Sequence, residues 1–220
     1  MTRGAFLDTG VALAFCFKTD THHHRCREYI EQNVYELYAS ELVVREFDGR
    51  EPDLAERQSD GIFEHIMHLR QSAYEGQLDS LDMAQIRQQE LSTKNPAYPV
   101  LFDFYQNEIG MYILFDELIG RLRDLARDID QNAQERRSEL FDLIELWSRS
   151  EEYPTIDEAL SSIHGSDRHI CLDAHDLARN RDDATELATT NPNDFVRNGH
   201  RELILTETAL DDVISLAVSR

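Results

Sequence analysis

Polar side chains follow or flank several short apolar segments of this 220-residue chain. Asp8 ends the apolar run GAFLD, and Glu46 lies in the first turns of the helical segment that follows YELYAS. Asp167 opens the segment DRHICLDAHDLARN, and Asn191 and Asp194 come directly after ATELATT. Because ligands gather at the carboxyl ends of the strands in a parallel α/β sheet, we expect these five side chains at one edge.

Carboxylates gathered in one place predict a bound cation. Like charges held together raise the free energy unless a positive charge lies among them. Oxygen ligands without a thiolate or patterned histidines suit Mg²⁺ or Mn²⁺. Such an ion holds a phosphate, activates water and stabilises the leaving oxygen. The five residues therefore predict a Mg²⁺ or Mn²⁺ site suited to phosphate chemistry.

The triplet Asp8-Thr9-Gly10 also has the sequence of an aspartic-protease motif. Such a protease needs two aspartates that share a proton, on a body built almost wholly of β-structure. This chain has a single Asp-Thr-Gly triplet, and most of its patterns are helical. The sequence thus argues against a protease.

The composition limits the class of protein. The net charge is −21, and only two of the 22 basic residues are lysines, Lys18 and Lys94. This balance resembles proteins of salt-in halophilic archaea; an acidic mesophilic protein is the alternative. In molar salt the Debye length falls to about 3 Å, so the charge does not exclude a nucleic-acid substrate. Three cysteines without a paired spacing and no export signal or membrane-length apolar run predict a cytoplasmic protein with reduced thiols.

Strands alternating with helices predict an α/β fold with a parallel sheet. The expected strands are residues 4–8, 35–40, 184–190 and 201–207, with helices after the first two and at 22–33, 155–163, 167–180 and 209–218. Residues 51–154 are helical in period, including RSELFDLIELWSRS at 137–150. We therefore expect a single domain over 1–220, with an α/β core from 1–50 and 155–220 and a helical insertion of about 51–154.

Four blocks in order carry a family resemblance. FLDTGVALAFCFKTDTHHHRCREYI resembles the amino-terminal signature of PIN domains, and ASELVVREF resembles their second block. DRHICLDAHDLA resembles the third block, and LATTNPNDF resembles the last. The match covers roughly 1–50 and 155–210, and Gly10 stands where relatives often have Asn or Ser.

This resemblance implies a three-layer α/β/α sandwich and a Mg²⁺- or Mn²⁺-dependent nuclease, commonly an endoribonuclease. Many relatives are toxins of toxin–antitoxin pairs, and others process RNA or cut structured nucleic acids. Carried over, Asp8, Glu46 and Asp167 would be metal ligands, and Asp194 or Asn191 would complete the site. Thr9 or Thr190 would position water or metal through its hydroxyl. The resemblance implies an RNA substrate and, for a toxin, an antitoxin protein as partners. A dimer arm in the helical middle would make a second copy of the chain a further partner, and the lack of a membrane-length apolar run predicts no membrane.

Other interpretations stay open. The chain is either an active nuclease, on RNA or structured DNA, or a catalytically degenerate PIN scaffold that binds proteins. The insertion is either a dimer arm, a substrate clamp or a helical cover. Asp8 could simply cap the helix at Val11, and Asp167 favours a helix N-terminus with or without metal. Four arginines near these blocks either contact phosphates or form surface ion pairs: Arg25, Arg27, Arg45 and Arg168.

Overall fold

The chain forms two compact units in this computed structural model, which describes residues 3–18, 20–32 and 34–217. Unit 1 comprises Met1–Cys16, Thr21–Arg50 and Arg136–Arg220, and unit 2 comprises Phe17–Asp20 and Glu51–Glu135. The last residues of two expected helices, Asn33 and Val218, lie outside the described residues.

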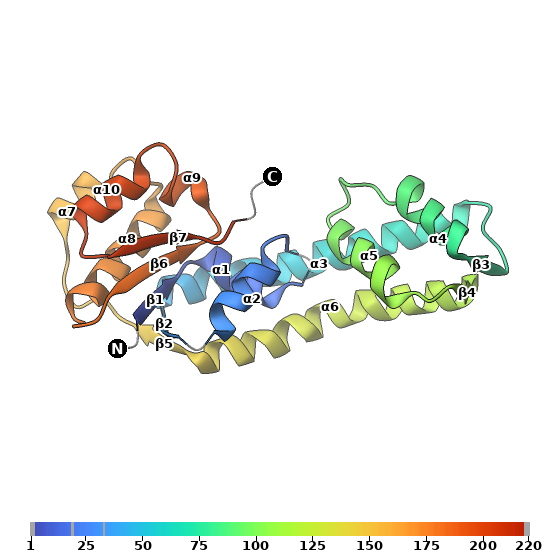
Figure 1. Cartoon of the computed structure of the whole chain (residues 1–220), viewed down its shortest axis with the longest axis horizontal. Coiled ribbons are helices and arrows are strands. Elements are labelled where there is room, and N and C mark those ends of the chain that lie inside the picture. The colour runs from blue at the N-terminus through green and yellow to red at the C-terminus, as the bar shows by residue number, and fades with distance from the viewer. Residues whose placement is uncertain (1–2, 19, 33, 218–220) are drawn as a thin grey trace. The chain divides into compact units, whose positions relative to one another are not determined.

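A five-stranded parallel sheet forms the centre of unit 1 (Figure 1). Its strands are β1 (Arg3–Leu7), β2 (Tyr35–Ser40), β5 (Ile144–Trp147), β6 (Thr185–Thr189) and β7 (Asp212–Ser215). The spatial order is β5-β2-β1-β6-β7, with Leu7 of β1 paired with Ala188 of β6. The chain thus extends from β1 to one side and later returns to the other, which places the topological switch point between β1 and β6.

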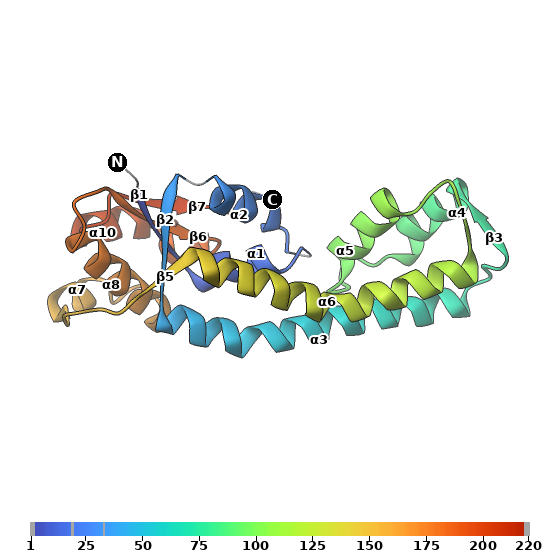
Figure 2. The same cartoon turned by 90° about the horizontal axis from the view of Figure 1, so that it is seen from below.

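Helices cover both faces of this sheet, which confirms the expected α/β fold with a three-layer α/β/α arrangement. The helices that lie wholly within unit 1 are α1 (Thr9–Cys16), α2 (His23–Glu31), α7 (Pro154–Ala159), α8 (Gly165–Arg179), α9 (Pro192–Phe195) and α10 (His200–Glu207). Because crossovers between parallel strands are right-handed, α1 and α2 belong to one face and α7 to α10 to the other (Figures 1 and 2). Within residues 3–18, 20–32 and 34–217, no helix has both the length and the apolar character that a membrane crossing requires.

Three predictions of secondary structure were wrong for segments that belong to unit 1. Residues 201–207, expected as a strand, form α10, and the expected closing helix at 209–218 contains β7. Residues 144–147, placed in the helical insertion, form β5 and pair with β2 in the parallel sheet. Short apolar runs fit a helix or a strand equally well, so pairing with a neighbouring strand decides their structure.

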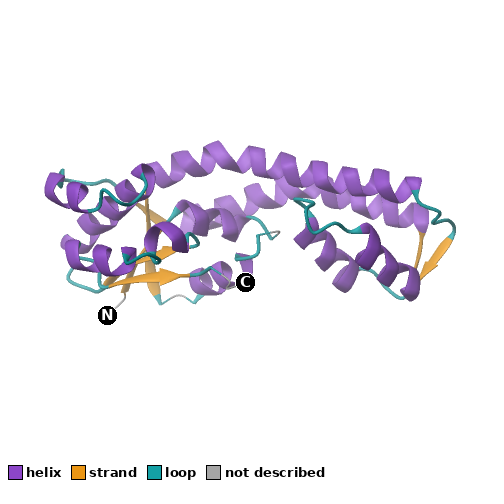
Figure 3. Cartoon of the chain, turned by 90° about the horizontal axis from the view of Figure 1, so that it is seen from above, coloured by secondary structure: helices purple, strands orange, loops and turns teal. Residues whose placement is uncertain are grey.

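The described part of unit 2 is mostly helical and contains one short antiparallel pair of strands (Figure 3). It contains most of α3 (Glu41–Gln71) and of α6 (Phe115–Leu143), the antiparallel pair β3 (Gln77–Asp79) and β4 (Tyr112–Leu114), the helices α4 (Ser80–Gln85) and α5 (Tyr98–Asp103), and the π-helical turns η1 (Ile86–Glu90) and η2 (Phe104–Glu108). Leu118, Leu122 and Ile129 of α6 recur at spacings of four and seven residues, and all three are buried. This apolar side of α6 therefore belongs to the core of unit 2.

A buried carboxylate joins α8 to the last residue of β5 and to the segment that follows it. Asp176 on α8 accepts hydrogen bonds from Trp147 Nε1 at 2.9 Å and from Tyr153 Oη at 2.5 Å. Ser150 donates to the same carboxylate from its backbone N–H at 3.1 Å and from its hydroxyl at 2.9 Å. Burial alone would raise the pKa of Asp176, but these donors outweigh it and lower the pKa below the usual value.

We expect Asp176→Ala to lower the free energy of unfolding by about 3 kcal/mol, because several donors to a charged group lose their partner. Urea unfolding followed by far-ultraviolet circular dichroism measures the change. Asp142→Ala, at an exposed position of α6, is the control and should change stability by less than about 0.5 kcal/mol. Equal effects of the two substitutions would show that the Asp176 network contributes nothing.

Candidate functional site

Asp8 lies at the carboxyl end of β1, at the switch point of the sheet. Its side chain is almost fully buried, and one oxygen accepts a hydrogen bond from the Val11 backbone N–H at 2.7 Å. This bond caps the N-terminus of α1. The other oxygen accepts a hydrogen bond from the Thr189 hydroxyl at the end of β6. Asp8 therefore joins the two central strands at the edge where ligands bind in such sheets.

Asn191 connects the end of β6 to two further carboxylates. Its backbone N–H donates to the Thr189 hydroxyl oxygen at 2.8 Å. Its side-chain Nδ2 donates to Asp194 Oδ2 at 2.7 Å and to Asp167 Oδ2 at 3.3 Å. Asp167 lies in the first turn of α8 and Asp194 on α9. One amide group thus lies between two acids that come from different helices.

Glu46 reaches the same edge from α3. The hydroxyl of Thr9, which is buried at the start of α1, donates to Glu46 Oε2 at 2.6 Å. The charge of Glu46 also acts on Asp167, whose pKa it helps to raise. The structure thus places the four predicted acids, Asn191 and Thr9 at the same edge of the sheet.

Burial and mutual repulsion perturb two of these acids. Burial raises the pKa of Asp8 to about 6, against the hydrogen bonds from Thr189 and Val11, and the charge of Asp167 adds to the rise. Burial also raises the pKa of Asp167 to about 6, with repulsion from Asp194 and Glu46. The neighbouring positive groups do not cancel these effects, so the cluster has an excess of negative charge.

Gly10 and Thr190 fit each other closely beside Asp8. A Cβ atom on Gly10 would lie 2.2 Å from Thr190 Oγ1 and 3.4 Å from Asp8 Oδ1. A contact of 2.2 Å is far inside van der Waals distance, so any larger residue at position 10 would displace the Thr190 side chain. The close approach of Thr190 therefore explains why position 10 carries a glycine, although PIN domains often have Asn or Ser there.

The donor chemistry of the cluster suits a hard divalent cation, but its present geometry does not. Among the described residues, no group of three or more His, Cys, Asp or Glu side chains is arranged so that it could hold a metal ion. The carboxylates instead accept hydrogen bonds from neutral donors, of which Asn191 Nδ2 serves two. A cation could bind here only if it replaced some of these donors.

The four arginines near the sequence blocks differ in their contacts. Arg27 pairs with Glu31 at 2.6 Å, and Arg168 pairs with Asp157 at 2.7 Å. Arg25 Nη1 donates to the carbonyl of Ala217. Arg45 donates only weakly to a backbone carbonyl in its own helix, at 3.4 Å, and lines a pocket.

Sequence reasoning missed Thr189. The sequence pointed to the hydroxyls of Thr9 and Thr190 as supporting groups. In the structure, the hydroxyl that donates a hydrogen bond to Asp8 is that of Thr189. The register that pairs Leu7 with Ala188 places Thr189 beside Asp8, one residue further along each strand. Only this register shows that Thr189 and not Thr190 lies beside Asp8, and strand register cannot be read from the sequence.

Comparisons with known proteins add no relative: no family model matches the chain, and neither curated proteins nor solved structures give a match. The resemblance to PIN domains therefore rests on the four sequence blocks.

The raised pKa values predict how stability depends on pH. Folded Asp8 and Asp167 hold their protons up to about pH 6, whereas the unfolded chain releases them near the usual 3.8. Their stabilising contribution is therefore complete below pH 3.8 and is lost as the pH rises to about 6. We expect Asp8→Asn to make this loss smaller and to leave the variant about 2 kcal/mol more stable than the wild type at pH 7.

Urea unfolding at pH 4 and pH 7 tests this expectation. Asp142→Asn, at an exposed position, should keep the wild-type dependence on pH. A variant Asp8→Asn that is less stable than the wild type at pH 7 would contradict the account of a carboxylate under electrostatic strain.

Proposed function

We propose that the chain is a Mg²⁺- or Mn²⁺-dependent endoribonuclease of PIN-domain type that hydrolyses phosphodiester bonds of RNA in the cytoplasm. The observation that carries the proposal is the convergence of Asp8, Glu46, Asp167 and Asp194 at the switch point of the sheet. These acids come from four separate parts of the sequence, and burial with mutual repulsion raises the pKa of two of them. Perturbed acids at the carboxyl edge of a parallel sheet are typical of functional sites.

The residues of the site have separate roles in this proposal. A bound ion would activate water and stabilise the leaving oxygen of the phosphodiester. The four carboxylates would hold such an ion, and Asn191 would offer its amide oxygen if its Nδ2 no longer donated to Asp167 and Asp194. Thr189 and Thr9 orient Asp8 and Glu46 through the hydrogen bonds seen in the structure. Thr190 lies beside Asp8, where its hydroxyl can orient water.

A specific observation favours a second candidate, a catalytically degenerate PIN scaffold that binds proteins. Both oxygens of Asp8 are already satisfied by protein donors, and no described group of acids has metal-binding geometry. Unit 2 also exposes large apolar side chains, among them Leu81 at 74%, Met111 at 72% and Tyr112 at 63%. Exposed apolar surface of this kind suits a protein partner.

The partners differ between the two candidates. An RNA substrate is a partner of the nuclease alone. An antitoxin protein or a second copy of the chain fits both candidates, because a nuclease toxin binds its antitoxin and a scaffold binds proteins. Toxin–antitoxin function thus remains one form of the nuclease proposal.

We expect the protein to cleave RNA in molar KCl with Mn²⁺ and to lose this activity in EDTA. Asp8→Asn should reduce cleavage at least about a hundredfold, because it removes a charged ligand of the ion. Gel electrophoresis of labelled transfer RNA, ribosomal RNA and structured DNA measures cleavage and separates RNA from DNA as substrate. Mn²⁺ should also raise the melting temperature, since a ligand of the native state stabilises it.

Asp142→Asn is the matched control and should cleave like the wild type. Absence of cleavage on all three substrates, together with an unchanged melting temperature in Mn²⁺, would refute the nuclease and favour the protein-binding scaffold. Cleavage of DNA alone would support the metal site and show that the substrate is DNA and not RNA.

A further inference from the structure

Two pockets of unit 2, of about 320 and 510 Å³, lie between two helical segments, residues 80–91 and 98–111. The first segment contains α4 and η1, and the second contains α5 and η2 (Figure 1). The smaller pocket lies where the first segment begins and the second ends, and the larger pocket lies where the first ends and the second begins. The two segments therefore run in opposite directions, and the pockets follow one another along them.

The residues that line the two pockets recur at helical spacing. On the first segment they include Ser80, Ala84 and Arg87, and on the second they include Phe102, Gln106 and Ile109. Spacings of three and four residues place each set on one side of its segment. Because Arg87 lines both pockets, they form one groove with this arginine at its middle.

Acids are absent from the described residues that line this groove, although the chain has 43 acids among its 220 residues. The first segment contains two acids, and both have partners outside the lining. Glu90 contacts His68 Nε2 at 2.5 Å, and Asp82 accepts a hydrogen bond from the Asp79 backbone N–H at 2.9 Å. The described lining of the groove therefore contains no carboxylate that balances Arg87.

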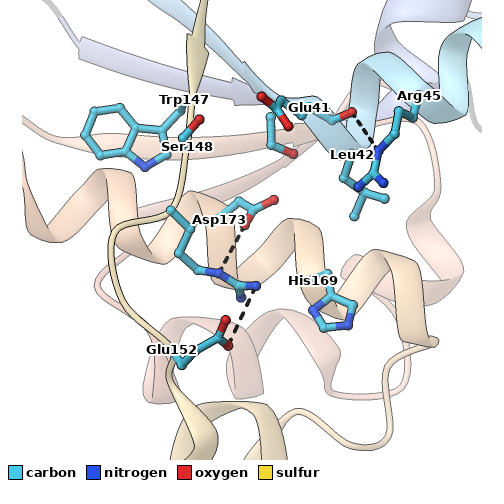
Figure 4. A pocket seen from close by; sticks show the side chains of 10 residues that line it. Glu41, Leu42, Arg45, Trp147, Ser148, Glu152, His169 and Asp173 are labelled. Carbon is cyan, nitrogen blue, oxygen red and sulfur yellow. Dashed lines mark hydrogen bonds and ion pairs between the residues drawn. The ribbon is translucent and has the colours of Figure 1, made fainter.

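The pocket of unit 1 in Figure 4 differs in this respect. It contains Arg45 and Arg149 together with three carboxylates, those of Glu41, Glu152 and Asp173. Arg149 lies 3.5 Å from Asp173 and 3.9 Å from Glu152, so acids of the same pocket balance its charge. The arginine of the unit 2 groove has no such neighbour in the described lining.

The guanidinium of Arg87 is available to a ligand. Its Cζ lies 5.8 Å from the centroid of the Phe102 ring, and this cation–π contact holds it at the groove. Among the described residues, the structure gives it no hydrogen bond and no ion pair. Arg87 is half-buried and Phe102 is 38% exposed, so a ligand in the groove can reach both. A carboxylate matches a guanidinium through two parallel hydrogen bonds, and its single charge balances that of Arg87.

Large apolar side chains continue the surface beyond the smaller pocket. Met111 lines this pocket and is 72% exposed, and Tyr112, the next residue, is 63% exposed. Leu81, which follows the lining residue Ser80, is 74% exposed. A small molecule that filled the pocket would leave Leu81 and Tyr112 in water, whereas a protein segment along the groove can cover them. The apolar surface thus favours a protein partner, and Arg87 favours an acid in that partner.

We propose that this groove binds a segment of another protein, with a carboxylate on Arg87 and apolar side chains on either side of it. The groove follows about three helical turns, or about 15 Å, which suits a helical segment of about ten residues. A two-fold symmetric dimer would place the groove against its own copy, whose described lining offers Arg87 no acid, so a different protein fits better. The binding requires no metal and no cleavage, and it is compatible with either candidate function.

A random-peptide selection tests the chemistry of the partner. Phage that display random peptides longer than the groove are selected on the full-length protein and depleted on its Arg87→Gln variant. The KCl concentration is the lowest that keeps the protein folded, because salt screens ion pairs. We expect the enriched peptides to share Asp or Glu with Leu, Ile, Met or Phe three or four residues away.

Fluorescence anisotropy of a labelled peptide from this selection measures the contact with Arg87. Arg87→Gln should weaken binding at least about tenfold, because a charge-assisted pair of hydrogen bonds is lost. Substitution of the peptide's acid by its amide should cost the same on the wild type and almost nothing further on Arg87→Gln. Gln106→Glu, at an exposed lining position, places an acid in the groove; it should also weaken binding, and it replaces Arg87→Gln if that variant does not fold. Arg70→Gln, at an exposed position of α3 outside the lining of both pockets, is the matched control and should bind like the wild type.

Three results would overturn the groove as a site for an acidic segment. The first is a selection that returns no peptide able to distinguish the wild type from Arg87→Gln. The second is a set of enriched peptides without an acid. The third is a pair of losses, from the arginine and from the peptide's acid, that add up and are not coupled.

Two further results would replace the occupant. Displacement of the peptide by phenylbutyrate with equal affinity would show a site for a small carboxylate. Self-association of the wild type that Arg87→Gln abolishes in sedimentation velocity would show that a second copy of the chain occupies the groove. Asp8→Asn separates this proposal from the nuclease, since it should stop cleavage and keep peptide affinity. Peptide binding by a wild type that cleaves nothing would support the groove without the nuclease.

Discussion

Carboxylates from four segments meet at the switch point of the sheet, and neutral hydrogen-bond donors hold them there. The Val11 backbone N–H and the Thr189 hydroxyl donate hydrogen bonds to Asp8. The side-chain amide of Asn191 donates to Asp167 and Asp194. Burial and repulsion raise the pKa of Asp8 and Asp167, and the positive charge of Arg50 near Asp167 does not cancel this rise. Such an arrangement lowers stability at neutral pH, and a bound cation would reverse that effect. The proposed activity depends on this one imbalance of charge.

The central part of the fold could be predicted from the sequence because it is buried on both faces. Strand β1 contains the apolar run GAFL followed by Asp8, which is typical of a buried strand of a parallel sheet, whereas β6 (TELAT) is fully buried although it mixes apolar and polar residues. The periphery could not be predicted in the same way. The segments of β5 and β7 are four residues each, and their strand structure comes from pairing with β2 and β6. Local periodicity contains no information about that pairing.

The site shows the same division between local and tertiary information. The polar residues after the strands could be named from sequence, because strand ends in a parallel sheet meet at one edge. The partners of those residues depend on strand register and on side-chain packing. Thr189 could not be told from Thr190, and the fit of Gly10 against Thr190 had no local signal.

A crystal grown with Mn²⁺ would test the central claim most directly, through the anomalous scattering of the metal. We expect a peak among Asp8, Glu46, Asp167 and Asp194, with Asn191 Nδ2 turned away from Asp167 and Asp194. No peak at this edge at saturating Mn²⁺, with the Asn191 amide still bonded to both acids, would contradict the account. The cluster would then be a set of acids held by hydrogen bonds alone.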